Sequence, residues 1–144
     1  MKVDETVSHI SNAVVGGSWV IYLGEDAKGG SVVGASAVDG SDHKVITRHG
    51  PGPKGGWAAA SLSASTDGSR VAYYGYGAGR WLRVLGLDGK EHARVPGVAG
   101  AHVYFLGNTH LVSGSNRKVL VRKIGEAHGR IIAIDAIVVP PSGF

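Results

Sequence analysis

The sequence contains no cysteine, which excludes disulfide bonds, thiolate metal ligands and a cysteine nucleophile. No apolar run approaches the roughly 18 residues that a membrane-spanning helix needs. Asp4 and Glu5 lie in the N-terminal stretch, which has no apolar run of the length found in a signal peptide. We therefore expect no membrane partner. A cytoplasmic location is the default, although the absence of cysteine leaves the compartment open.

Proline is scarce, with five residues, whereas glycine is abundant, with 24 of 144. Apolar residues make up 43% of the chain and charged residues 18%, which is a globular composition. The length predicts a single domain over residues 1–144. The net charge of +4 is modest and the basic residues are scattered, so we expect no nucleic-acid ligand.

Glycine-containing turns recur between short apolar runs and reveal an internal repeat. Gly16-Gly17, Asp67-Gly68 and Gly107-Asn108 each separate two such runs, as the turn of a β-hairpin does. Gly17, Gly68 and Asn108 are 51 and 40 residues apart. This period is that of a four-stranded propeller blade, about 40 to 50 residues.

A second hairpin follows each first one. Its turns are expected at Asp39-Gly40, at Asp88-Gly89 and near Gly125-Glu126, and Gly40, Gly89 and Glu126 are 49 and 37 residues apart. The two sets of turns predict three blades and one connector rich in glycine and proline. The blades are expected at residues 5–47, 57–95 and 98–139, and the connector at residues 48–56.

No segment has apolar residues at helical spacing, and valine is frequent in the apolar runs. The predicted fold is therefore all-β and β-propeller-like, with about three four-stranded antiparallel blades. A sandwich or closed barrel of about twelve strands is an alternative with the same turn spacing. The repeat weighs against it.

The stretch "STDGSRVAYYGYGAGRWLRVLGLDGKEHARV" resembles a blade of the TolB-type β-propellers. The resemblance lies in the Ser-x-Asp-Gly turn, the Val-Ala-Tyr strand and the Leu-Asp-Gly strand end, with Thr66 in place of the usual proline. The third copy, "FLGNTHLVSGSNRKVLVRKI", is similar to a WD-repeat blade without its Trp-Asp dipeptide. The resemblance implies half of a six-bladed propeller and does not imply a function.

Closed propellers usually have about four to eight blades, so three blades leave both outer flanks of the stack open. We expect completion by self-association, with a two-fold dimer of six blades favoured, or by a partner. The alternative is a fragment whose partner blades are missing. The apolar C-terminal stretch predicts an oligomer interface formed by Ile131, Ile132, Ile134, Ile137 and Val139.

Aromatic residues of the middle copy are the candidate ligand-binding group. The predicted residues are Tyr74, Tyr76, Arg80 and Trp81. Gly75, Gly77 and Gly79 lie between strands and have no helix after them, so they do not form a dinucleotide-binding loop. Protein and glycan ligands both remain open.

The histidines show no catalytic or metal-binding spacing. We assign His43, His92 and His128 to solvated flanks of the second turns, and give His102 and His110 a structural role. The basic cluster on the last copy contains Arg117, Lys118, Arg122, Lys123 and Arg130, and it fits a solvated face or an acidic partner. There is no Gly-x-Ser-x-Gly motif. We therefore expect no catalytic residue, no metal site and no cofactor.

The sequence thus predicts a non-enzymatic binding or scaffolding module built from propeller blades and completed into a ring by homo-oligomerisation. Two alternatives remain: a structural subunit of a larger particle, of the viral coat or decoration type, and a lectin-like propeller that binds carbohydrate. A hydrolase whose catalytic domain is missing is the least supported alternative, because no catalytic triad is visible.

Overall fold

The computed structural model describes residues 1–50, 58–77, 79–96, 102–115, 118–125 and 130–133, in which all the regular elements are β-strands. The strands are β1 (Val7–Gly16), β2 (Trp19–Asp26), β3 (Ser31–Ala37), β4 (His43–His49), β5 (Ala58–Ala64), β6 (Arg70–Gly77), β7 (Gly79–Gly86), β8 (Glu91–Pro96), β9 (His102–Leu106), β10 (His110–Ser115), β11 (Lys118–Lys123) and β12 (Arg130–Ala133). The all-β expectation is confirmed. β4 includes Arg48 and His49, which were expected in the connector.

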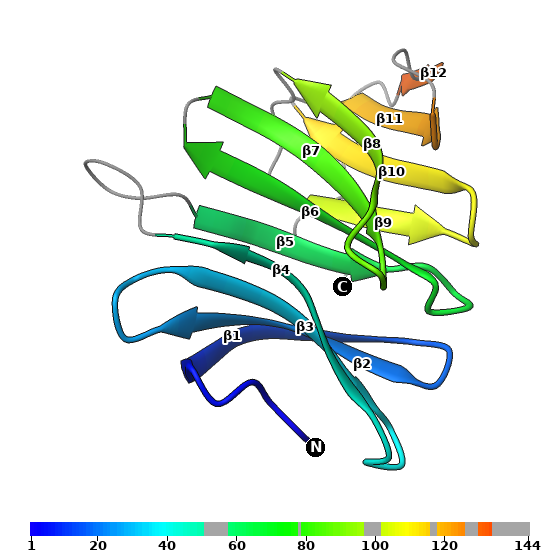
Figure 1. Cartoon of the computed structure of the whole chain (residues 1–144). Coiled ribbons are helices and arrows are strands. Elements are labelled where there is room, and N and C mark those ends of the chain that lie inside the picture. The colour runs from blue at the N-terminus through cyan, green and yellow to red at the C-terminus, as the bar shows by residue number, and fades with distance from the viewer. Residues whose placement is uncertain (51–57, 78, 97–101, 116–117, 126–129, 134–144) are drawn as a thin grey trace, which may run out of the picture.

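The strands form three four-stranded sheets, in the orders β1-β2-β3-β4, β5-β6-β7-β8 and β9-β10-β11-β12, and every neighbouring pair is antiparallel. Figure 1 shows the sheets stacked face to face, with the second sheet between the first and the third. The first strands of the sheets are neighbours, because β5 contacts β1 on one side and β9 on the other. This is the arrangement expected of successive propeller blades.

Glycines with positive φ occupy equivalent turns in all three sheets. They are Gly17, Gly68 and Gly107 in the first hairpins, and Gly40, Gly89 and Gly125 in the second hairpins. The left-handed backbone of these turns favours glycine, which has no Cβ to clash. In the third copy the glycines of the turns are Gly107 and Gly125, each one residue before the position aligned from the sequence. Asn108 keeps the spacing to the following strand that Gly68 has in the second copy.

The first turns also contact one another across the sheets. Gly17 N–H donates to the Thr66 carbonyl at 2.9 Å, and Thr66 N–H donates to the Gly107 carbonyl at 3.2 Å. A Cβ on Gly68 would collide with the Gly16 carbonyl oxygen. Backbone hydrogen bonds and close glycine contacts therefore fix the spacing of the sheets at this end.

Hydroxyl groups of β5 hold β9 in the same way. Val103 N–H donates to Ser61 Oγ at 2.8 Å, and Phe105 N–H donates to Ser63 Oγ at 3.0 Å. Ser61 has a φ of 54°, within a register shift of β5 between Ala60 and Ser63. The irregular backbone thus places two hydroxyls against alternate N–H groups of the next sheet.

Two apolar clusters lie between the sheets. The first sheet and the second share Ile21, Leu23, Val33, Ala35, Ile46, Leu62, Val71, Tyr73 and Leu85. The second and third share Ala72, Tyr74, Leu82, Val84, Val103 and Leu111. The middle sheet is therefore buried on both faces.

Candidate interaction surfaces

The third sheet has one face packed on the second sheet and one face turned away from it. Val103 and Leu111 belong to the buried cluster and are 0% and 3% exposed. Side chains alternate along a strand, so Tyr104 and Leu106 point the other way, and they are 59% and 58% exposed. The ring of His102 stacks on that of Tyr104, with centroids 6.2 Å apart. We call the surface of His102, Tyr104 and Leu106 the third-sheet face.

The third-sheet face continues onto the neighbouring strands. Val112 of β10 lies opposite Tyr104 of β9 and opposite Val121 of β11. Residues directly opposite in an antiparallel pair share a face of the sheet. Both valines are half-buried, so an apolar strip extends from β9 to β11.

The predicted interface residues lie at the far edge of this sheet or beyond it. In β12 the register pairs Ile131 with Leu120 and Ile132 with Val119. Ile134, Ile137 and Val139 lie outside the described residues. The interface predicted from the C-terminal stretch thus stays a prediction.

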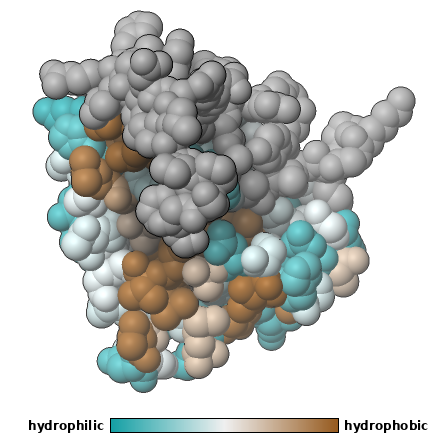
Figure 2. All heavy atoms as spheres, turned by 180° about the vertical axis from the view of Figure 1, so that it is seen from behind, coloured by the Kyte–Doolittle hydropathy of each residue, from teal (hydrophilic) through white to brown (hydrophobic). Residues whose placement is uncertain are grey.

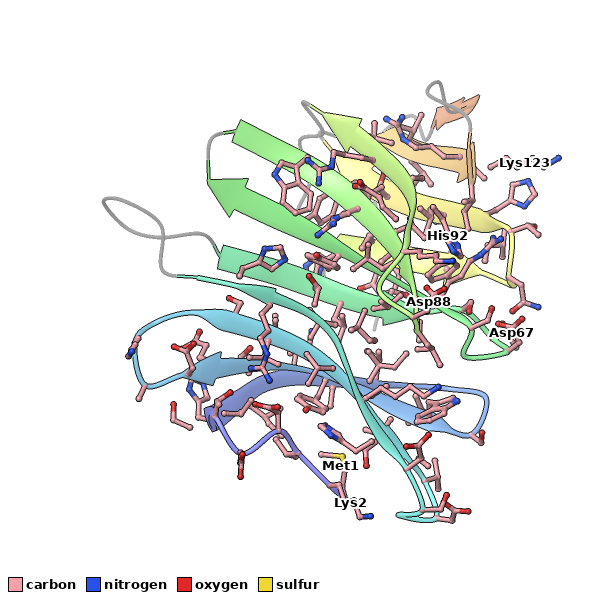
Figure 3. The ribbon with its side chains drawn as sticks, viewed as in Figure 1. Met1, Lys2, Asp67, Asp88, His92 and Lys123 are labelled. Atoms are coloured by element: carbon pink, nitrogen blue, oxygen red, sulfur yellow. The ribbon has the colours of Figure 1, made fainter. Side chains whose placement is uncertain are left out.

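The first sheet also has a face turned away from the second sheet, and residues 1–6 lie on it. Lys2 N–H donates to Ser36 Oγ at 3.0 Å, and Asp4 N–H donates to the Tyr22 hydroxyl at 2.9 Å. Tyr22 and Ser36 are both 0% exposed. Figure 3 shows Lys2 on the side of the first sheet that is away from the other two. We call residues 1–6 the N-terminal cap.

An ion pair holds the cap at its centre. The Arg48 guanidinium donates to Asp4 Oδ2 at 2.6 Å and to Thr6 Oγ1 at 2.9 Å. The hydrogen bond from Arg48 is the main reason that the pKa of Asp4 falls to about 2. Asp4 is therefore ionised at neutral pH, and the ion pair stays intact in mild acid.

The cap leaves apolar residues uncovered on the first sheet. Ile10, Val15 and Val38 are 37%, 68% and 63% exposed. Figure 2 shows apolar side chains among polar ones on the lower part of the molecule, where the first sheet lies. The first and third sheets, at the two ends of the stack, therefore both expose apolar surface, as expected for blades at an open end.

A cavity of about 390 Å³ opens beside the turns of the first sheet. It is lined by Ser18, Trp19, Ala37, Val38, Asp39, Ser41 and Asp42. The Lys44 ammonium lies 5.3 Å from the centre of the Trp19 ring. A cation of this chain therefore already lies over the only aromatic ring of the lining.

Polar and aromatic side chains join the first sheet to the second. His49 Nε2 is 3.0 Å from the Tyr73 hydroxyl, and Arg83 donates to the same hydroxyl at 3.2 Å. Because arginine can only donate, the hydroxyl has its own proton to give to His49 Nε2. A neutral imidazole with Nε2 unprotonated can accept this hydrogen bond.

Electrostatics keep that imidazole neutral. Burial and then the charges of Arg83 and Arg94 lower the pKa of His49 to about 4. Arg83 and Arg94 both donate to Glu91 Oε1, at 3.1 and 2.6 Å. Burial also raises the pKa of Tyr73, whose side chain is 0% exposed. The network thus binds two sheets together and offers a substrate no access to the tyrosine.

The predicted ligand-binding residues lie in and around this contact. Tyr74 is 2% exposed and packs in the cluster shared with the third sheet. Trp81 is half-buried and meets the Tyr73 ring edge-on at 5.8 Å, with the Arg94 guanidinium 5.2 Å from its ring centre. Tyr76 and Arg80 are register partners in β6 and β7. A ligand role for this group of residues stays a prediction. The buried ring of Tyr74 has no exposed face that could contact a ligand.

One histidine assignment is corrected by the structure. His43 flanks the second turn as the first residue of β4, but its side chain is half-buried rather than solvated. It stacks on the Tyr22 ring and its Nε2 is 2.7 Å from the Tyr22 hydroxyl. His92 is exposed, as expected. His128 lies outside the described residues, among which no group of three His, Cys, Asp or Glu could hold a metal ion.

Sequence reasoning missed the cap, the His49 network and the third-sheet face. Only the third has a readable signal: His102, Tyr104 and Leu106 alternate with the buried Val103 and the half-buried Phe105. A search for membrane spans finds no helix long and apolar enough to cross a bilayer within the part of the chain that the structure describes.

No protein-family model matches the sequence, and no curated protein matches it. Chains of known structure do match. A chain in the crystal structure of a nidogen/laminin complex is 11% identical and superposes with a TM-score of 0.59, over 81% of this chain and 43% of that chain. At this identity the match shows the fold alone, which is all-β and propeller-like. The chain spans 43% of the length of the solved chain that it matches.

Proposed function

We propose that the chain is a non-enzymatic binding module whose three blades, of TolB-like or WD-repeat-like type, are completed by a second copy into a six-bladed ring. The observation that carries the proposal is the exposure of Tyr104 and Leu106, 59% and 58%, on the last sheet of the stack. In the stack itself, the corresponding face of the second sheet is buried against the third. A sheet face of this kind is stabilised by covering it.

The charges of the two end sheets favour a head-to-tail pairing. Residues 1–50 contain four Lys or Arg and six Asp or Glu, whereas residues 102–133 contain five Lys or Arg and one Glu. With neutral histidines these segments carry net charges of −2 and +4. A two-fold ring places the third sheet of each chain beside the first sheet of the other, so that unlike charges meet twice.

The structural comparison is compatible with a protein partner. The matched chain comes from the structure of a complex between two named proteins, nidogen and laminin, and this chain aligns with less than half of it, 43%. If the chain forms half of a propeller ring, we expect it to align with only part of a chain that contains a whole propeller. The partner that we propose here is the second copy.

The test is sedimentation velocity on Leu106→Asp. An aspartate on the third-sheet face adds a buried carboxylate and faces the acidic first sheet, so we expect at least a tenfold weaker dimer. Lys90→Asp is the control: it changes the net charge further but lies in an exposed turn of the middle sheet. Equal dissociation constants for the two variants would exclude this face from the interface.

The same experiment separates the alternatives. An assembly much larger than a dimer would favour the particle subunit. A monomer at all concentrations, with saturable glycan binding that is lost in Trp81→Ala, would favour the lectin-like module. Neither alternative is supported by a contact among the described residues.

A further inference from the structure

Tyr22 and Tyr73 hold equivalent positions in the first and second sheets. Each lies five residues after the positive-φ glycine of its first turn, Gly17 or Gly68, and each is 0% exposed. Each hydroxyl also contacts a side chain of its own sheet, His43 for Tyr22 and Arg83 for Tyr73. We therefore compare the hydrogen-bond partners that the two hydroxyls have outside their own sheets.

Outside its own sheet, the Tyr73 hydroxyl contacts the preceding sheet, whereas the Tyr22 hydroxyl contacts the N-terminal cap. The Tyr73 hydroxyl is paired with His49, on the last strand of the first sheet, at 3.0 Å. The Tyr22 hydroxyl accepts the Asp4 backbone N–H at 2.9 Å. The N-terminal cap thus occupies, on the first sheet, the place that a preceding sheet occupies on the second.

Among the described residues, four hydrogen bonds join the cap to side chains of the first sheet. They are the Lys2 bond to Ser36, the Asp4 bond to Tyr22 and the bonds from Arg48 to Asp4 and Thr6. The side chain of Arg48 is 48% exposed and that of Asp4 is 12% exposed, so water still reaches the ion pair and the pair changes an equilibrium constant only a few-fold. A four-stranded sheet offers a much larger contact area than six residues do. The cap is therefore a weak occupant of this surface.

We propose that the surface under the N-terminal cap is the docking site for the third sheet of a second copy, and that the cap and the copy compete for it. This inference rests on the proposed ring. Without the cap, residues 7–50 contain three Lys or Arg and four Asp or Glu, a net charge of −1 against +4 for residues 102–133. This difference selects a second copy as the occupant. In the separated chain the cap shields Tyr22 and Ser36 from water, as a polar capping unit does at the end of a repeat stack.

Competition makes the apparent dissociation constant of the dimer depend on the cap. Asp4→Asn removes the ion pair with Arg48, and we expect a dimer about two- to fivefold tighter, the factor that corresponds to an exposed ion pair. Glu25→Gln is the matched control: it also exchanges a carboxylate for an amide, at an exposed contact with His9 on the first sheet. We expect it to leave the dissociation constant within twofold of the unmodified chain.

A second measurement follows the cap itself. Hydrogen exchange of the peptide that contains Asp4 is measured at concentrations below and above dimer formation, in the unmodified chain. We expect protection of the Asp4 amide to fall on dimer formation, because the partner displaces the cap. Equal or greater protection in the dimer would overturn the inference.

The outcomes separate this inference from the proposed function. If the unmodified chain dimerises through Leu106 but the Asp4 amide stays protected, the proposal of a six-bladed ring is supported. The proposal that the cap and the second copy compete is then wrong. If neither the unmodified chain nor Asp4→Asn associates at any concentration, the ring itself is wrong and the docking site falls with it. Circular dichroism of Asp4→Asn checks that the variant is folded.

Discussion

At the scale of single residues, the clearest consequence of the fold concerns His49. Its pKa of about 4 lies below the ordinary value of 6.5, because the imidazole is partly buried beside Arg83 and Arg94. The unfolded chain therefore binds a proton at this residue between pH 6.5 and pH 4 that the folded chain does not bind. Stability falls as the pH decreases through this window.

We predict that His49→Gln reduces this loss of stability. Glutamine can still hydrogen-bond to the Tyr73 hydroxyl but cannot be protonated in this range. The measurement is the urea midpoint at pH 7 and at pH 5, compared between the unmodified chain and the variant. The exposed His92, changed to glutamine in the same way, is the control and keeps the original difference. An unchanged difference in His49→Gln would show that other groups set the acid sensitivity.

The limits of sequence reasoning at this scale are clear from Tyr73 and Tyr74. Alternation along a strand assigns them to opposite faces, which predicts that one of the two is exposed. Both are buried, at 0% and 2% exposure, because the second sheet has a neighbour on each side. The position of a sheet in the stack is a long-range property, and the local pattern does not contain it.

At the scale of elements, the hairpin turns could be predicted from the sequence, but the contacts between neighbouring sheets could not. Glycine at a left-handed turn position is a local requirement, so the hairpin turns could be read from the sequence. The contact of Gly17 with Thr66 depends on how two sheets are spaced. The N-terminal cap has no apolar periodicity at all, since backbone N–H groups and one ion pair hold it.

We predict that Gly68→Ala destabilises the chain more than Gly40→Ala does. Both glycines have positive φ, 76° and 78°, so both variants lose about 1 kcal/mol or slightly more from backbone strain. The added Cβ at Gly40 meets open space, whereas the one at Gly68 collides with the Gly16 carbonyl. We expect a total loss of about 2 kcal/mol or more for Gly68→Ala, measured by urea unfolding. Equal losses would mean that the turns are not in close contact in solution.

At the scale of the whole molecule, three sheets form a stack whose two ends differ in charge. Figure 3 shows Lys123 on the third sheet and Met1 at the opposite end of the stack. The first-sheet segment carries −2 and the third-sheet segment +4, so the chain has a polarity along the stacking direction. Head-to-tail association uses this polarity, and tail-to-tail contact of two third sheets is disfavoured by like charge.

We predict that raising the salt concentration weakens the dimer. Screening shortens the range of charge attraction from roughly 30 Å at 0.01 M to roughly 8 Å at 0.15 M. The expected change is a several-fold increase in the dissociation constant between these two concentrations, measured by sedimentation equilibrium. A dimer that tightens with salt would instead point to an interface held by apolar contacts alone.

The central claim is that three blades are half of a ring that a second copy completes. It is tested most directly by the mass in solution, measured by light scattering across a dilution series of the unmodified chain. We expect twice the chain mass of 14.8 kDa at high concentration, falling to the single-chain mass on dilution. A mass of one chain throughout the series would contradict the ring.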